Sequence, residues 1–323
     1  MRKRGGFLTT KTKVKRKRNR LDRTVTIPFL IMLAPGALVL LINNYIPMLG
    51  GIMAFQQYRF RENFIYSIMN SEWVGFANFE FLFRNPRLWE VLRNTIAYNF
   101  VFIILGMIVP VAVAIMLNEL WRPKLAKFFQ TVMFLPFFLS WIVVSYLVFA
   151  LLQTTGAVNT MILTPLGLDP VNWYMTVGAW PWILVLLNLW KYTGYNSVIY
   201  LAAISNISQE YYEAAMIDGA NKRQQMWYIT VPLIRPVIII LSLLAVGRIF
   251  NSDFGMFYNI PMGRSALFSV TEVLDTFIYR AMRGANEFGM PVAASLFQSL
   301  VGFITIMLAN FTVRRIDPDS SLF

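Results

Sequence analysis

Long apolar runs are the feature that most restricts how this chain can fold. Six segments are dominated by apolar residues and are long enough for a helix to cross a hydrocarbon core of about 30 Å. Lipid leaves no water to bond the backbone, so such runs predict helices. Proline and glycine inside them are interpreted as routine kinks, with hinges as the alternative. The predicted spans cover residues 27–50, 95–117, 129–152, 179–204, 229–251 and 291–313. The predicted fold class is therefore an all-α membrane protein with six transmembrane helices.

Composition favours a membrane protein and removes several kinds of chemistry. Charged residues are 14% of the chain, whereas soluble domains carry about 25%. Cysteine and histidine are absent, so disulfides, thiol catalysis and His-based metal sites or general bases are excluded. No G-x-x-x-x-G-K-[ST] phosphate loop occurs, so the chain lacks that ATPase signature. We predict no catalytic residue, metal site or cofactor in this chain, and a partner must supply any energy.

A basic tail precedes the first span. Eleven of the 29 Lys and Arg residues lie between Arg2 and Arg23. Such a run can bind nucleic acid, but its place directly before an apolar segment favours the cytoplasmic side and contact with anionic membrane lipid. We therefore predict a cytoplasmic tail over residues 1–26, a six-span domain over residues 27–323, both termini in the cytoplasm, and no nucleic-acid partner. Without the tail the two sides are nearly equal in Lys and Arg, so the tail decides the orientation.

A short polar and small-residue segment, Glu213-Ala-Ala-Met-Ile-Asp-Gly-Ala220, lies between the fourth and fifth spans. Its acidic residues precede Lys222 and Arg223, an order that suits the dipole of a short helix. Gly219 permits a turn that a residue with a Cβ resists. Three residues separate Glu-Ala-Ala from Gly219, and nine more lead to Ile229-Thr-Val-Pro232. The predicted orientation places this segment in the cytoplasm.

The spacing of this segment resembles the EAA loop of the permease subunits of ATP-binding-cassette (ABC) importers. The one departure is Val231, where that family usually has Leu. The resemblance implies the type I, maltose-permease-like importer fold. It also implies a loop whose helix docks in a groove on a separate ATPase subunit, which binds ATP and Mg²⁺, and transmits its closure. The residues assigned to this coupling loop, within 205–232, are Glu213, Ala214, Ala215, Asp218, Gly219, Ala220, Ile229 and Pro232.

Further stretches resemble the carbohydrate branch of these permeases, over roughly residues 25–317. They are Asn44-Tyr-Ile-Pro-Met48, Trp73-Val-Gly-Phe-Ala-Asn-Phe79, Leu92-Arg-Asn-Thr95, Phe134-Leu-Pro136 and Ser140-Trp141. Within that branch the chain is most similar to members associated with polygalacturonan-type and alginate oligosaccharides. The resemblance implies a bacterial cytoplasmic (inner) membrane, a second permease subunit, a pair of ATPase subunits, and an extracytoplasmic solute-binding protein that delivers an oligosaccharide.

Polar residues inside the fourth and fifth spans are candidates for the substrate path, because ionisable groups in lipid usually face a cavity or a partner helix. They recur at steps of three and four residues, which places each set on one helical face. The candidates are Asn188, Lys191, Tyr192, Tyr195 and Asn196 in the fourth span, and Arg248 and Asn251 in the fifth. Lys191 and Arg248 would favour an acidic (uronate) oligosaccharide if both line the path. The alternative is that these two cations pair between helices or snorkel to a headgroup.

Other functions stay open from the residues alone. A permease for a neutral sugar or glycerol phosphate would share most of these features. A membrane-embedded transferase needs convergent acids or a metal site, yet apart from Glu119 the acids fall largely in predicted loops. A channel or secondary transporter would work without an ATPase, and the sequence lacks the inverted repeats that favour the latter.

Overall fold

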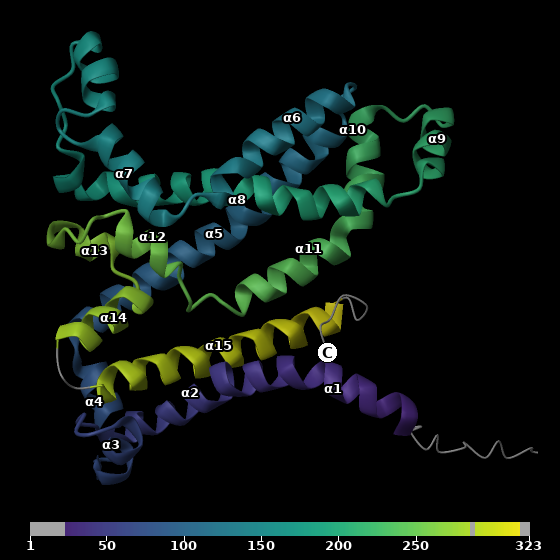
Figure 1. Ribbon diagram of the computed structural model, residues 1–323. Coiled ribbons are helices and arrows are strands. Elements are labelled where there is room, and N and C mark those ends of the chain that lie inside the picture. The colour runs from purple at the N-terminus through teal and green to yellow at the C-terminus, as the bar shows by residue number, and fades with distance from the viewer. Residues whose placement is uncertain (1–22, 285–287, 317–323) are drawn as a thin grey trace, which may run out of the picture. The chain divides into compact units, whose positions relative to one another are not determined.

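The chain folds almost entirely into helices, which range from single turns to a rod of 33 residues (Figure 1). The computed structural model describes residues 23–284 and 288–316. The predicted basic tail lies outside the described residues up to residue 22. The chain divides after Gly51 into two compact units.

The first unit is one apolar helical segment. α1 (Arg23–Leu40) continues through a wider turn, η1 (Leu41–Tyr45), and α2 (Ile46–Met48). The tighter helix η2 (Leu49–Phe55) then leads into the second unit. The helical path therefore extends past both ends of the span predicted at 27–50, and Ile27–Phe55 is long and apolar enough to cross a membrane.

Two long helices, α5 (Pro86–Asn118) and α8 (Trp180–Ser205), pack along each other at the centre of the second unit (Figure 1). α5 begins well before residue 95, where the apolar run starts. The reason is local: Asn85 caps the helix by accepting a hydrogen bond from the Arg87 N–H (3.0 Å), and Pro86 takes the first helical position. α8 has 26 residues, which gives a length of about 39 Å.

The predicted third span is a broken helix rather than a straight one. α6 (Pro123–Phe134) and η3 (Leu135–Phe138) meet α7 (Trp141–Leu152) at a bend of 99°. Ser140 caps α7 by accepting from the Val143 N–H at 3.3 Å. Pro136 lies in η3, directly before this bend.

Close contact with α8 holds α6 in place. A Cβ on Gly194 of α8 would lie 1.9 Å from the carbonyl oxygen of Met133 in α6, so only glycine fits at this crossing. The close approach brings the break after α6 against the middle of α8, where the polar residues of the fourth span lie.

The segment between α8 and the fifth span contains two short helices. α9 (Gln209–Ile217) and α10 (Lys222–Gln225) lead through a wider turn, η8 (Met226–Thr230), into α11 (Val231–Val246). α11 packs against α5, α8 and the last helix, α15 (Gly289–Ile316). Figure 1 shows α9 and α10 at one end of the long helices, beyond α8 and α11.

Short elements fill the connections at the other end. β1 (Gln56–Gln57) pairs antiparallel with β2 (Glu72–Trp73), with Gln56 opposite Trp73. The remaining elements are α3 (Phe64–Asn70), α4 (Ala77–Arg84), η4 (Val158–Leu163), η5 (Thr164–Leu166), η6 (Trp173–Met175), η7 (Val177–Ala179), α12 (Phe254–Asn259), η9 (Ser265–Leu267), α13 (Phe268–Thr271) and α14 (Leu274–Gly284). α14 buries Leu274, Phe277 and Ile278 against α4, α5 and α15.

Among the described residues, four helical segments are long and apolar enough to span a membrane, and the bent α6–α7 pair would be a fifth. α8 is as long as the others but is less apolar, because it carries the polar residues singled out above. Helices lie at the six predicted positions in the predicted order, and four of them, or five with the broken pair, have the length and apolarity of a membrane span.

Candidate functional site

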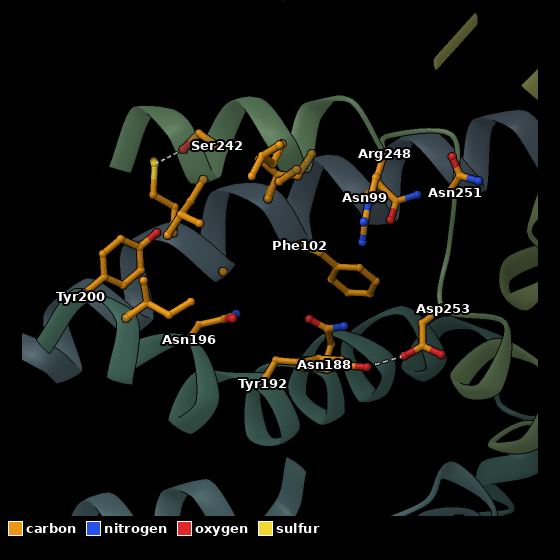
Figure 2. A pocket seen from close by; sticks show the side chains of 17 residues that line it. Asn99, Phe102, Asn188, Tyr192, Asn196, Tyr200, Ser242, Arg248, Asn251 and Asp253 are labelled. Carbon is orange, nitrogen blue, oxygen red and sulfur yellow. Dashed lines mark hydrogen bonds between the residues drawn. The ribbon is translucent and has the colours of Figure 1, made fainter. Parts of the chain in front are cut away.

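A cavity of about 520 Å³ lies between α5, α8 and α11 in the second unit (Figure 2). α8 supplies Asn188, Tyr192 and Asn196, which recur every four residues and so share one face. α5 supplies Asn99 and Phe102 from its first half. The segment that follows α11 closes one end with Arg248, Asn251 and Asp253.

Amide side chains give the cavity its hydrogen-bonding capacity. Asn99 has a structural role, because its Nδ2 donates to the carbonyl of Ile249 (2.9 Å) and to the Ser252 hydroxyl (3.1 Å). The amides of Asn188, Asn196 and Asn251 make no hydrogen bond to any described residue. These three amides can each donate and accept, so they are available to a ligand rich in hydroxyl groups.

Arg248 is the cation of the cavity. Its guanidinium reaches into the cavity beside Asn99 (Figure 2) and has no ion pair within the described part of the chain. Asp253, at the same end, does not neutralise it. The Asp253 carboxylate instead accepts two short hydrogen bonds, one from the Tyr192 hydroxyl and one from the Trp141 indole (2.6 Å each). Both donors are neutral, so the cavity contains one arginine and one carboxylate that are not paired with each other.

Asp253 joins three separate elements at this end of the cavity. One oxygen binds Tyr192 of α8 and Trp141 at the start of α7, and the other accepts from the Met256 N–H (3.2 Å) and so caps α12. Gly255 leaves room for the Trp141 ring, because a Cβ there would lie 2.6 Å from it. The network orients Tyr192, whose ring forms part of the cavity wall.

Lys191 and Tyr195 do not line the cavity. Lys191 is only 5% exposed, and its ammonium donates to the carbonyls of Pro136 and Phe137 (3.2 Å each) and Leu139 at the break after η3. Tyr195 stacks on Phe137, with ring centroids 4.1 Å apart. Successive helical residues point about 100° apart, so Lys191 cannot face the cavity when Tyr192 does.

Lys191 thus satisfies carbonyls that the broken helix leaves free. Such groups are costly in lipid unless a neighbouring side chain bonds them. The ammonium also lies 5.0 Å from the centre of the Trp141 ring, which contributes a cation–π contact. The sequence argument missed Asn99, Phe102 and Asp253. Asn99 could have been found as an amide inside an apolar run, and Asp253 as an acid just after a span.

The coupling loop takes its shape from short-range hydrogen bonds. Ser208 caps α9 through the Glu210 N–H (3.3 Å). At the other end Gly219 has φ +82°, as its predicted turn requires, and a Schellman motif closes the helix. In that motif the Ala220 N–H donates to the Ala215 carbonyl (2.8 Å) and the Gly219 N–H to Met216 (3.1 Å).

The remaining coupling-loop residues follow the same path. Glu213 and Ala214 lie exposed on α9 and Asp218 ends it, whereas Ala215 and Ala220 are half-buried. Asn221 and Gln224 form a reciprocal capping box at the start of α10 (2.8 and 3.0 Å). Ile229 lies in η8, and Pro232 takes the second position of α11, directly after the wider turn η8.

Two contacts tie the short helices of the coupling loop to the end of α5 and to η8, the turn that leads into α11. The hydroxyls of Tyr212 in α9 and Thr230 in η8 are 2.9 Å apart, and Thr230 is buried. Lys222 forms an ion pair with Glu119, the residue that follows α5 (3.1 Å). The apolar side chains of Met216 and Ile217 at the end of α9 are exposed, Ile217 by 87%.

Comparison with known proteins defines the class. Residues 106–318 match the family described as the inner membrane component of binding-protein-dependent transport systems. The match covers more than half of the chain and includes α8, the coupling loop and α11. The chain belongs to this family, and it is a multi-pass membrane protein.

Particular relatives are close to this chain over most of its length. Protein LplB of Bacillus subtilis (strain 168) is 33% identical over 90% of this chain and 89% of its own. The polygalacturonan/rhamnogalacturonan transport system permease protein YteP of the same organism is 33% identical over 88% and 87%. These likenesses confirm the predicted similarity to carbohydrate permeases.

Solved structures give the same result. The chain is similar to one in a crystal structure of a bacterial ABC transporter involved in the import of the acidic polysaccharide alginate (TM-score 0.82, 31% identity, 92% of this chain and 98% of that chain). A second similar chain comes from a bacterial alginate ABC transporter in complex with an alginate pentasaccharide-bound periplasmic protein (TM-score 0.81, 32% identity, 91% and 96%). The predicted all-α ABC importer fold is confirmed.

Proposed function

We propose that this chain is one of two permease subunits of an ATP-driven importer for acidic (uronate) oligosaccharides. The observation that carries the proposal is the cavity between α5, α8 and α11. It offers unbonded amides for sugar hydroxyls and the rings of Phe102 and Tyr192 for the apolar faces of sugars. The relatives that import alginate or carry polygalacturonan in their names support the same class of substrate.

Arg248 carries the preference for an acidic sugar. A guanidinium presents a planar fork of donors that matches a carboxylate, and the pair is strongest where water is excluded. Lys191 no longer contributes to this argument, because its ammonium is held by backbone carbonyls. A single cation thus distinguishes a uronate from a neutral sugar of the same shape.

The coupling loop supplies the contact with the energy source. α9 presents exposed Met216 and Ile217 beyond the long helices, a small apolar surface that suits a groove on an ATPase subunit. The Lys222–Glu119 and Tyr212–Thr230 contacts would carry its movement to α5 and α11. Both helices line the cavity, so a shift of the loop would change which side of the membrane the cavity faces.

The remaining parts of the importer lie outside this chain. A pair of ATPase subunits binds ATP and Mg²⁺, a second permease completes the path, and a solute-binding protein delivers the sugar from outside. Both termini and the coupling loop are cytoplasmic in this arrangement. Transport proceeds by alternating access, and this chain performs no covalent chemistry.

A transport assay with matched substrates tests the proposal. The assembled importer in lipid vesicles is supplied with a uronate oligosaccharide and with its carboxyl-reduced, neutral counterpart. We expect ATP-dependent uptake of the acidic sugar, and a loss of at least tenfold in kcat/KM for that sugar alone in Arg248→Gln. Arg235→Gln, an exposed arginine on the same part of the chain, is the control. Equal uptake of both sugars by wild type and variant would instead identify a neutral-sugar permease.

A further inference from the structure

A cluster of aromatic rings lies directly beyond the Asp253 end of the cavity. α12 begins at Phe254, the residue after Asp253, and the rings of Phe254 and Tyr258 stack with centroids 5.1 Å apart. Tyr279 of α14 meets both rings edge-on at 5.0 and 5.1 Å. None of the three is buried, so the cluster forms a partly accessible surface where the cavity ends.

α14 carries a polar stripe away from the cavity. Asp275, Tyr279 and Arg283 recur every four residues, so they share one face of α14. Leu274 and Ile278, which are buried, point about 100° away from their neighbours Asp275 and Tyr279. The stripe is about 12 Å long, since each helical residue rises 1.5 Å. It starts at the cavity rim, because the Asp275 carboxylate accepts from the backbone N–H of Ser252 (2.8 Å).

Asp275 is committed to this structural role. Its second oxygen accepts from the Gln298 amide (3.2 Å). Burial raises the pKa of Asp275 above its usual value, and the hydrogen bonds from Ser252 and Gln298 act in the opposite direction. With both oxygens bonded, Asp275 fixes the start of the stripe.

The two arginines of α14 differ sharply in their surroundings. Arg280 is neutralised by Glu272 (2.7 Å) and lies over the Phe268 ring at 3.7 Å. Arg283 is exposed, and no carboxylate of the described residues lies within ion-pair distance of it. Its guanidinium lies 5.8 Å from the centre of the Tyr279 ring. Arg283 thus contacts the side chains of Tyr258 and Tyr279 and has no carboxylate partner among the described residues.

We propose that Tyr258, Tyr279 and Arg283 form a second subsite, which binds one acidic sugar residue of an oligosaccharide before or while the rest occupies the cavity. The inference rests on the proposed function. A guanidinium beside a ring offers a carboxylate partner and an apolar face together, the same combination that Arg248 and Phe102 offer inside the cavity. Two such subsites in line suit a chain of repeated uronate units better than a single sugar.

The test measures uptake by the complete importer in vesicles for the matched acidic and carboxyl-reduced oligosaccharides. We expect Arg283→Gln to raise KM for the acidic sugar several-fold with little change in kcat and no change for the neutral sugar. Arg283→Lys should restore part of the loss. Tyr279→Leu should raise KM for both sugars, whereas Tyr279→Phe, which keeps the ring, should not. Arg87→Gln, which removes an exposed arginine at the start of α5, is the control and should change nothing.

The outcomes separate this inference from the proposed function. Uptake of the acidic sugar by wild type with an unchanged KM in Arg283→Gln would overturn the subsite alone. An equal rise in KM for both sugars in Arg283→Gln would also overturn it, since that pattern indicates a change in structure rather than a lost carboxylate contact. No uptake of either sugar by the wild-type importer would overturn the proposed function and the subsite with it.

Discussion

In the coupling loop, the hydrogen bonds that set the backbone path join residues two to five positions apart, as in Asn221 with Gln224 and Ala220 with Ala215. Around the cavity they span far greater separations: 61 positions between Tyr192 and Asp253, and 112 between Trp141 and Asp253. The loop can therefore form its shape from its own residues. The cavity exists only when α5, α7, α8 and the segment after α11 are packed together.

This difference indicates which substitutions should disturb each region. A change in the loop is expected to act on the loop and on its coupling. A change at a distant helix crossing is expected to disturb the cavity, because its polar side chains are held by partners on other elements. The following substitutions test that distinction in order of expected effect.

The largest effect is expected from Gly194→Ala, at the crossing of α6 and α8. The added Cβ would lie 1.9 Å from the Met133 carbonyl oxygen, a backbone atom that cannot rotate away. We expect a loss of about 3 kcal/mol or more, at the upper end of overpacking costs, seen as poor recovery and a lower Tm in detergent. Gly106→Ala in α5 meets no atom within 4 Å and is the matched control. A normal Tm for Gly194→Ala would contradict the close crossing.

Lys191→Met should have an intermediate effect on stability and little effect on selectivity. Removing the ammonium leaves the carbonyls at the α6–α7 break without their donor, a loss of about 2 kcal/mol. The assay is Tm together with the ratio of acidic to neutral sugar uptake in vesicles. Arg248→Gln should show the reverse pattern, with a normal Tm and a changed ratio. If Lys191→Met kept its stability but lost the preference for the acidic sugar, Lys191 would belong to the substrate path after all.

The smallest effect on stability is expected from Gly219→Ala in the coupling loop. A φ of +82° costs a residue with a Cβ about 1 kcal/mol, so the Schellman turn should loosen while the helices stay folded. We expect a near-normal Tm but a reduced ratio of sugar transported to ATP hydrolysed. Gly167→Ala adds similar strain at φ +72° in a loop between α7 and α8 and should leave that ratio unchanged. If both variants transported the same amount of sugar per ATP hydrolysed, the turn at Gly219 would have no specific role in coupling.

The sequence alone was enough to place the helical segments and the turn of the coupling loop, but not the break between α6 and α7. Apolar length and the lack of water in lipid require helices, and the φ of Gly219 follows from the chemistry of a single residue. The family also followed from local spacing, since Glu213, Gly219 and Pro232 lie within one short segment. Each of these features depends on residues that are neighbours in the chain.

Only the tertiary structure decided which polar residues meet. Lys191 and Tyr192 are adjacent in sequence and equally plausible for the path, yet one faces the break after α6 and the other faces the cavity. The carbonyls at the break are bonded by the Lys191 ammonium of α8. The two side chains that donate to Asp253 lie on α7 and α8. Helices far away in the chain decide what each face of α8 contacts. The periodicity of α8 alone does not show which neighbour packs on which face.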